Sequence, residues 1–291
     1  MPAGRVVAAF GRAFLVDDGA NVVECVMRGK KGGVACGDRV SFALTHAGNG
    51  VIEAVAPRDN LLYRSDDMRS KLIAANVDQA AVVVAAVPYF REELLIRCLV
   101  ACETAGIPAL IVLNKTDLAE TATLAEHLKT YAALGYDIVA LSAKGDVSTL
   151  EHRLHGHTSV LVGGSGVGKS TLLNRLIPEA GATTGEISVA LDAGRHTTTH
   201  ARLYRLPVDE AGRGGALIDS PGMQEFGLRH LDPAALMAAF PEIRERLGEC
   251  RFYNCRHLKE PGCAVLAAVE SGGMLASRYK VYQSLLGQLS A

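Results

Sequence analysis

Residues 163–170 read Gly163-Gly164-Ser165-Gly166-Val167-Gly168-Lys169-Ser170, the most informative motif of the chain. It follows an apolar segment and opens a helical one, which is the context that a phosphate-binding P-loop, G-x-x-x-x-G-K-[ST], requires. Backbone N–H groups of such a loop close around phosphates, and the helix N-terminus adds favourable dipole charge. We expect Lys169 to neutralise the β- and γ-phosphates and Ser170 to offer its hydroxyl to Mg²⁺. The predicted nucleotide contacts end at Thr171.

On both sides of this loop, buried strands alternate with amphipathic helices from Gln79 onward. This pattern predicts βαβ units around a mostly parallel sheet. One helix is expected from Arg91 to Ala105, stopping at Gly106, and another after Thr121, stopping near Gly135. The predicted strands are 80–87, 109–113, 137–141, 159–162, 201–206 and 216–218.

Two short motifs at strand ends indicate which base binds. Asn114-Lys115-Thr116-Asp117 follows one predicted strand, at the edge where α/β folds bind ligands. A carboxylate at position 117 can accept from guanine N1–H and N2–H₂ together, whereas adenine lacks that donor pair. Ser142-Ala143-Lys144 ends the next strand and resembles the second guanine-binding loop of GTPases. With the P-loop, these motifs predict that GTP and GDP bind here.

The order of the motifs departs from that of Ras-like GTPases, in which the P-loop comes first. Here both guanine motifs precede the P-loop, and Asp219-Ser220-Pro221-Gly222 comes last. This order resembles the circularly permuted GTPases, and permutation is tolerated where the native termini lie close together. We expect Asp219 near Mg²⁺ and the N–H of Gly222 near the γ-phosphate.

Residues 194–199, Gly-Arg-His-Thr-Thr-Thr, lie between the P-loop and Asp219 and resemble switch I. We expect Thr199 to coordinate Mg²⁺ when GTP is bound, with Thr198 as the second choice. The alternative is a threonine-rich strand without a ligand role.

The N-terminal 56 residues predict a small β-barrel, because five short β-rich runs are separated by glycine-rich turns. An OB-type barrel is the first expectation and an SH3-like barrel the alternative. Residues 57–77 are charged and turn-rich, which predicts a linker. The five runs are 5–10, 13–16, 22–27, 39–44 and 50–55.

The C-terminal segment carries a cysteine and histidine cluster, Cys250-x₄-Cys255-x-His257-x₅-Cys263. Three thiolates and one imidazole make a closed tetrahedral set suited to structural Zn²⁺. A closed set leaves no position for a substrate, so we expect zinc to fold this tail. The alternative is a group of isolated buried cysteines. Apart from this cluster, the chain after Asp232-Pro233 is predicted to be helical.

Composition and charge bear on the cellular location of the chain and on the kind of partner it binds. Its longest uninterrupted apolar run, 80–88, is far shorter than the roughly 20 residues of a membrane-spanning helix, and Asp17 and Asp18 interrupt any signal-like start. We therefore expect a cytoplasmic protein. The net charge of −1 conceals two basic ends, because residues 1–64 hold 8 Lys/Arg against 6 Asp/Glu and residues 250–291 hold 5 against 2. Basic ends favour an RNA partner.

These motifs, with the run from Asp219 to His230 and the Cys/His cluster, resemble the family of ribosome small subunit-dependent GTPase A. The resemblance covers essentially the whole chain. It implies an OB-type barrel (1–60), a circularly permuted GTPase domain (61–230) and a helical zinc-binding domain (231–291). It also implies a monomeric factor that binds the 30S subunit and its 16S rRNA late in assembly, hydrolyses GTP when the subunit stimulates it, and then leaves. Neither DNA nor a membrane is an expected partner.

The residue that activates water is not the usual one. Ras-type enzymes orient the attacking water with a glutamine just after Asp-x-x-Gly, but Met223 stands there, and its thioether cannot do this. Slow intrinsic hydrolysis is expected. The resemblance implies that His230 acts on the water once the ribosome positions it. The alternative is a structural histidine.

Three other functions compete with this interpretation. A P-loop kinase or ATPase would require the guanine motifs to be accidental. An RNA-binding module with a vestigial nucleotide site would leave Lys169, Ser170 and Asp219 unexplained. A circularly permuted GTPase of large-subunit assembly is the nearest alternative, but the barrel and the Cys/His tail argue against it.

Overall fold

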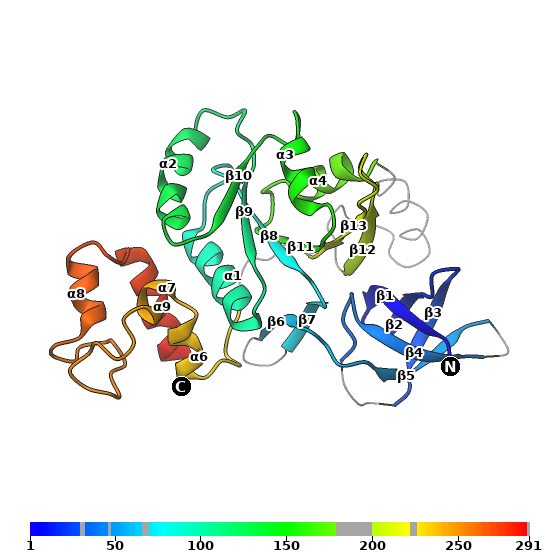
Figure 1. The fold of residues 1–291 in the computed structure, drawn as a ribbon, viewed down its shortest axis with the longest axis horizontal. Coiled ribbons are helices and arrows are strands. Elements are labelled where there is room, and N and C mark those ends of the chain that lie inside the picture. Colours follow the sequence, from blue (N-terminus) through cyan, green and yellow to red (C-terminus); the bar gives the residue numbers. More distant parts are fainter. Residues whose placement is uncertain (30–32, 46–47, 66–69, 179–199, 222–225, 290–291) are drawn as a thin grey trace.

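The computed structural model describes residues 1–29, 33–45, 48–65, 70–178, 200–221 and 226–289. In Figure 1 a small barrel lies at the lower right, a sheet with helices in the upper centre and a helical tail at the lower left. None of the described helices is both long and apolar enough to cross a membrane.

The barrel closes in the order β1-β2-β3-β5-β4-β1, with β3 and β5 parallel. Five strands in this arrangement confirm the OB-type prediction. Alternate residues such as Val6, Phe14 and Phe42 point inward and form its apolar core. The strands are β1 (Ala3–Phe10), β2 (Ala13–Asp17), β3 (Val22–Met27), β4 (Arg39–Leu44) and β5 (Gly50–Val55).

The central sheet has the order β10-β9-β8-β11-β13-β12. The first five strands are parallel and β12 is antiparallel to β13, so the sheet is mostly parallel, as predicted. Strand β12 also pairs with β1, which joins the barrel and the central sheet into one continuous ladder. The strands are β8 (Gln79–Val84), β9 (Ala109–Leu113), β10 (Asp137–Ala140), β11 (Thr158–Gly163), β12 (Ala201–Leu206) and β13 (Gly215–Asp219).

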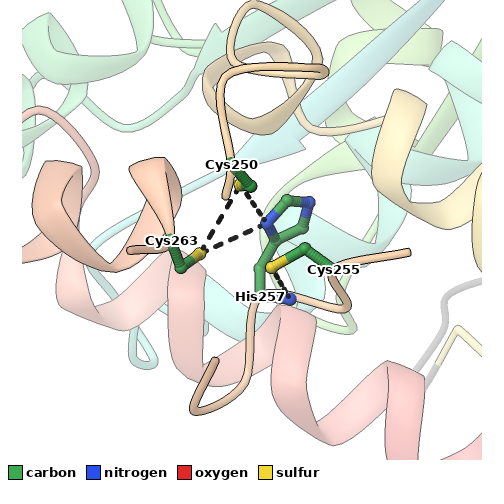
Figure 2. A group of neighbouring side chains, drawn as sticks. All are labelled: Cys250, Cys255, His257 and Cys263. Carbon is green, nitrogen blue, oxygen red and sulfur yellow. Dashed lines mark hydrogen bonds between the residues drawn. The ribbon is translucent and has the colours of Figure 1, made fainter. Parts of the chain in front are cut away.

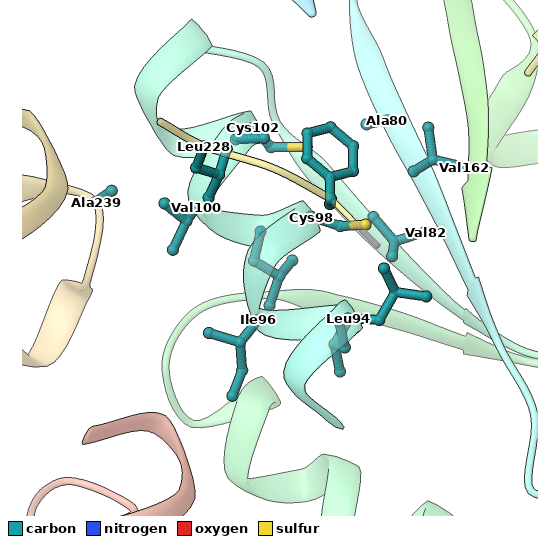
Figure 3. Packing of buried hydrophobic residues seen from close by; sticks show 14 of the residues in the cluster. Ala80, Val82, Leu94, Ile96, Cys98, Val100, Cys102, Val162, Leu228 and Ala239 are labelled. Carbon is teal, nitrogen blue, oxygen red and sulfur yellow. The ribbon is translucent and has the colours of Figure 1, made fainter. Parts of the chain in front are cut away.

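Helices cover both faces of this sheet. Residues 80, 82 and 84 of β8 join the core under α1 and α2, whereas 81 and 83 join the core under α3 and α4. Figure 3 shows the α1 side chains Leu94, Cys98 and Cys102 packed toward Ala80 and Val82. Helix α1 ends at Gly106 in the left-handed conformation, as predicted. The helices are α1 (Glu92–Ala105), α2 (Thr121–Ala132), α3 (Ser148–Leu154) and α4 (Lys169–Leu176).

The segment expected to be a linker is a β-hairpin, so that prediction is wrong. Strands β6 (Leu61–Ser65) and β7 (Ser70–Ala75) pair antiparallel, and Leu62 and Ile73 are buried in the core beside α1. A bulge after Leu62 interrupts the alternation of side chains. This irregular pattern, together with flanking charges, concealed the strands in the sequence.

The tail is helical and packs against α1 and α2. Asp232 caps α6, because its Oδ1 accepts the Ala235 N–H at 2.8 Å, and Pro233 begins the helix, as predicted. The buried Arg278 makes a bidentate ion pair with Glu242 at 2.5 and 2.9 Å, and its guanidinium lies over the ring of Tyr131 on α2. The helices are α6 (Pro233–Ala238), α7 (Pro241–Arg244), α8 (Ala264–Glu270) and α9 (Ala276–Leu289).

Candidate nucleotide site and metal centre

Asn114 joins the three loops that the sequence places far apart. It is buried just after β9. Its Nδ2 donates to the carbonyl of Val167 at 2.9 Å, and its Oδ1 accepts the N–H groups of Lys115 and Ala143 at 2.8 and 2.9 Å. The P-loop and both guanine motifs therefore meet at the carboxyl edge of the parallel strands, despite their inverted order.

The P-loop depends on glycine where its backbone is left-handed or closely packed. Gly163 has φ +147°, and a Cβ there would lie 2.4 Å from the carbonyl oxygen of Val83. Gly168 has φ +100°, and a Cβ there would lie 2.2 Å from Asn114 Nδ2. The second clash involves the amide that joins the three loops, so the shape of the P-loop and the position of the guanine motifs depend on each other.

Replacing Gly168 with alanine should disrupt nucleotide binding. The new Cβ must displace Asn114, and the left-handed backbone adds strain of about 1–3 kcal/mol. We expect the affinity for GDP to fall at least about 30-fold, as measured by titration with a fluorescent GDP. Gly214→Ala is the matched control, because its Cβ would make only ordinary contact, 3.5 Å from Val208. Equal affinity of both variants would contradict the importance of this junction.

Lys169 lies inside the P-loop. Its side chain is buried, and Nζ donates to the carbonyls of Gly163 and Gly164 at 2.9 and 2.8 Å. Burial lowers the pKa of Lys169, while the negative charge of Asp219 opposes this shift. Asp219 is itself buried at the end of β13, whose register places it beside Leu161 of β11. The cation and the carboxylate predicted to act on phosphate and Mg²⁺ therefore lie on one edge of the sheet.

The start of α4 and the end of β13 supply hydroxyl groups with different surroundings. Ser170 and Thr171 are exposed in the first turn of α4, where they are accessible to a ligand. Ser220 is buried, and its Oγ donates to the carbonyl of Leu161 at 2.7 Å. This bond ties the residue after Asp219 to the strand that leads into the P-loop. No sequence motif predicts this role for Ser220.

The guanine motifs are held by hydrogen bonds between them. Oδ1 of Asp117 accepts from Ser142 Oγ at 2.7 Å, and Lys144 Nζ lies 3.4 Å from Oδ2. These two partners, Ser142 foremost, lower the pKa of Asp117, so its carboxylate is ionised at neutral pH. Lys115 has a positive φ of 65°, and its Nζ donates to the carbonyls of Val87 and Gly166 at 2.9 and 2.7 Å. Lys115 thus connects the loop that follows β8 to the P-loop.

Several predicted site residues fall outside the described residues. They are the switch I segment with Thr198 and Thr199, and Gly222 with the neighbouring Met223. Their roles stay predictions.

His230 lies against the β6–β7 hairpin. Its Nδ1 is 3.0 Å from Ser65 Oγ, and the ring of Tyr63 lies 4.0 Å from the imidazole ring, centroid to centroid. Burial lowers the pKa of His230, which favours the neutral ring at pH 7. Neither of these contacts involves Asn114 or the P-loop, so the described contacts do not join His230 to the residues that Asn114 brings together.

The Cys/His cluster converges as predicted (Figure 2). Cys250 Sγ and Cys263 Sγ are 3.9 Å apart, and His257 Nδ1 lies 3.5 and 3.4 Å from them. Tetrahedral Zn²⁺ with bonds of about 2.3 Å to sulfur and 2.0 Å to nitrogen implies separations of about 3.8 Å and 3.5 Å. The ligand atoms of these three residues and Cys255 all lie within 4.8 Å of one another. The geometry of the described residues fits this ion.

Neighbouring residues shape the cluster. His257 has a positive φ of 58°, and the hydroxyl of Tyr279 on α9 donates to its carbonyl at 2.7 Å. Glu260 accepts the N–H groups of Arg256, Leu258 and Lys259 at 2.8–3.0 Å. Although burial opposes ionisation, these backbone bonds lower the pKa of Glu260 to about 2. No sequence motif marks Glu260 as part of this centre. Its place between His257 and Cys263 was the only signal available.

Known proteins match this chain along its whole length. A family model described as RsgA GTPase matches residues 55–229. Proteins named "Small ribosomal subunit biogenesis GTPase RsgA" from Paraburkholderia xenovorans and Burkholderia pseudomallei strain 1710b are each 52% identical, over 99% of this chain and 93% and 92% of their own lengths. The crystal structure of YjeQ from Thermotoga maritima aligns with a TM-score of 0.73 and 31% identity, covering 100% of this chain and 99% of its own. The structure titled "YloQ, a circularly permuted GTPase" aligns with a TM-score of 0.70 and 30% identity, covering 100% and 95%.

Proposed function

This chain belongs to the RsgA GTPase family, and from that premise we propose that it is a GTPase of small ribosomal subunit biogenesis. It binds the 30S subunit late in assembly, hydrolyses GTP when the subunit stimulates it, and then leaves. The observation that carries this proposal is the junction at Asn114, because it joins a P-loop to two guanine-reading motifs. The names of the 52% identical relatives favour the small subunit over the large one.

We assign the following roles in nucleotide binding. Asp117 accepts from the amino edge of guanine, and backbone N–H groups of residues 163–171 surround the phosphates. When nucleotide binds, Lys169 Nζ leaves the carbonyls of Gly163 and Gly164 and donates to β- and γ-phosphate oxygens. These charge-assisted hydrogen bonds offset the free-energy cost of burying the ammonium group. Ser170 and Thr199 would bind Mg²⁺, with Asp219 close to the ion, and the N–H of Gly222 would donate to the γ-phosphate. Bound Mg²⁺ neutralises charge that develops on the phosphates.

For hydrolysis we propose that His230 acts on the attacking water after the 30S subunit has repositioned it. The lowered pKa of His230 keeps its ring neutral, and a neutral imidazole can accept a proton. Its contacts with Ser65 and Tyr63 lie on the hairpin, so the free protein should hydrolyse GTP slowly. In this proposal, contact with the subunit releases His230 from Ser65 and Tyr63.

The remaining proposals concern partners and organisation. We propose that the barrel (1–60) and the zinc-binding tail (231–291) contact 16S rRNA, and that the GTPase domain (61–230) between them reads the nucleotide. Mild positive charge at both ends supports an RNA partner. The protein would work as a monomer in the cytoplasm, with neither DNA nor a membrane as partner.

GTP turnover with and without purified 30S subunits tests the proposed function. His230→Ala should lose stimulated turnover by about 100-fold or more, the usual contribution of a general base, without losing affinity for GTP. His152→Ala is the matched control, since that residue is exposed on α3 and bonds only its own helix among the described residues. Normal stimulation of His230→Ala would remove His230 from the mechanism. No stimulation of the wild-type protein, or equal turnover of ATP, would reject the proposed function itself.

A further inference from the structure

Lys115, in the first guanine motif, has a backbone conformation that residues with a side chain disfavour. Its φ of 65° lies in the left-handed region, where Cβ comes too close to a backbone carbonyl oxygen. Strain of this kind persists at functional sites because the surrounding contacts hold the residue in place. The groups that hold Lys115 therefore decide the shape of the loop that reads the base.

Two donors hold the carbonyl oxygen of Lys115. The N–H of Leu118 donates to it at 3.0 Å, which closes a turn from Lys115 to Leu118. The hydroxyl of Thr121 donates to the same oxygen at 2.7 Å. Both lone pairs of this carbonyl are thus used, and Asp117 lies inside the turn that the first bond closes.

Thr121 is the first residue of α2, but its hydroxyl bonds to the guanine motif and not to the helix. A threonine at a helix start commonly accepts an N–H of the first helical turn. Here the hydroxyl of Thr121 donates to a carbonyl six residues earlier, and Glu120, the residue before α2, makes no side-chain cap bond. Thr121 is only 3% exposed, so water competes little for this bond.

The Cys/His cluster contains the same arrangement. His257 also has a positive φ, of 58°, and its carbonyl accepts the hydroxyl of Tyr279 at 2.7 Å. Asn76 is the remaining non-glycine residue with positive φ in the described part of the chain, and its carbonyl accepts from Arg5 Nη2 at 3.3 Å. The two short hydroxyl bonds thus occur at the two candidate ligand sites. This recurrence supports a positioning role for Thr121.

We infer that Thr121 is a positioning residue for guanine recognition, because its hydroxyl holds the Lys115 carbonyl and so fixes the turn that presents the Asp117 carboxylate. The inference rests on the proposed function, since it concerns the same nucleotide site. The carboxylate must meet N1–H and the 2-amino group of guanine together. A small rotation of the turn therefore weakens binding of guanine more than binding of hypoxanthine, which lacks the 2-amino group.

Thr121→Val tests this inference, because valine keeps the shape of the side chain and removes the hydroxyl. The Lys115 carbonyl then loses a bond that water cannot replace, since the valine methyl group fills the space. We expect the affinity for GDP to fall about tenfold, and the ratio of GDP affinity to IDP affinity to fall at least about threefold. Competition against a fluorescent nucleotide measures both. Thr121→Ser keeps the hydroxyl and should restore both values.

Turnover with 30S subunits gives a second readout. In Thr121→Val the KM for GTP should rise while kcat stays unchanged, because the turn holds the base and not the reacting phosphate. Thr130→Val is the matched control, since Thr130 lies on the same helix and its hydroxyl donates to the carbonyl of His127 at 2.7 Å. It should bind GDP and IDP as the wild-type protein does. Thr121→Ala is the second variant without the hydroxyl and takes the place of Thr121→Val if valine impairs folding.

Melting temperatures of the nucleotide-free proteins separate positioning from stability. If Thr121→Val melted earlier but kept the wild-type GDP affinity and GDP-to-IDP ratio, the hydroxyl would only stabilise the fold and the inference would be overturned. Equal losses for GDP and IDP, or an equal loss of GDP affinity in Thr130→Val, would also overturn it.

The same proteins distinguish this inference from the proposed function. A wild-type protein without 30S stimulation would reject the proposed function, and a fall in the GDP-to-IDP ratio of Thr121→Val would still support the role of Thr121. Normal stimulation of the wild type, with an unchanged ratio in Thr121→Val, would reject the inference alone.

Discussion

Asp117→Asn should lower the affinity for GDP and GTP by at least about 100-fold and should transfer the preference to xanthine nucleotides. The carboxylate can accept from both N1–H and the 2-amino group of guanine, whereas an asparagine amide offers only one acceptor, and its NH₂ group would face that amine. Xanthine has a carbonyl at C2, which pairs with the NH₂ group. Competition of GDP and XDP against a fluorescent nucleotide measures the change.

The surroundings of Asp117 make this result specific. Ser142 Oγ donates to its Oδ1, and an asparagine oxygen can accept the same bond, so the loop should keep its shape. The pKa of Asp117 is lowered from its usual 3.8, and a lowered pKa means that the carboxylate persists until the pH falls below that value. Guanine affinity should therefore be constant between about pH 5 and 8.

Asp137→Asn is the matched control, because this aspartate is exposed at the start of β10 and pairs with Arg153. It should bind GDP as the wild-type protein does. If Asp117→Asn also kept its affinity for GDP, or failed to gain affinity for XDP, the assignment of the guanine-reading residue would be wrong.

Cys263→Ala should abolish metal binding by the Cys/His cluster and unfold the tail that carries it. Structural Zn²⁺ supplies about 10–16 kcal/mol of apparent binding free energy in zinc-finger peptides, which is comparable with the whole stability of a small domain, about 5–15 kcal/mol. Cys255 and Cys263 belong to the same core as Tyr282 and Leu285 of α9, so loss of the ion should loosen the packing of α9 on α1. We expect one zinc per chain in the wild-type protein and none in the variant, with a lower melting temperature.

Cys102→Ala provides the comparison, because this buried thiol lies in the core of α1 away from the cluster. It should retain zinc and lose only the roughly 1 kcal/mol typical of a small core truncation. Limited proteolysis should cut Cys263→Ala, but not Cys102→Ala, between residues 245 and 270. If Cys263→Ala retained zinc, or if a chelator left the melting temperature of the wild-type protein unchanged, the metal site would not be structural.

The permutation explains why the chain can reverse its motifs and still build one site. In a parallel sheet the carboxyl ends of all strands lie on one edge, so the order in which the strands occur does not decide which loops meet. Asn114 shows this directly, since its side chain contacts residues 29 and 53 positions later in the sequence. The family match and the structural matches agree with that arrangement.

The features that could be predicted from the sequence are those that depend on local chemistry. The P-loop spacing, the stop at Gly106, the cap at Asp232 and the spacing of the four metal ligands involve neighbours within about a dozen residues. The barrel and the mostly parallel sheet followed from hydrophobic periodicity, because burial on one or both faces leaves its period in the sequence.

The contacts between segments far apart in the sequence could be seen only in the folded chain. The β6–β7 hairpin, taken as a linker, is a sheet because Leu62 and Ile73 find a core beside α1, and the strand after Gln79 ends at Val84, three residues early. The pairing of β1 with β12 and the ion pair of Arg278 with Glu242 left no local pattern. Contacts of this kind depend on which apolar surfaces pack together in the folded chain. A short strand with charged neighbours has too little hydrophobic periodicity for its pairing partner to be predicted from sequence.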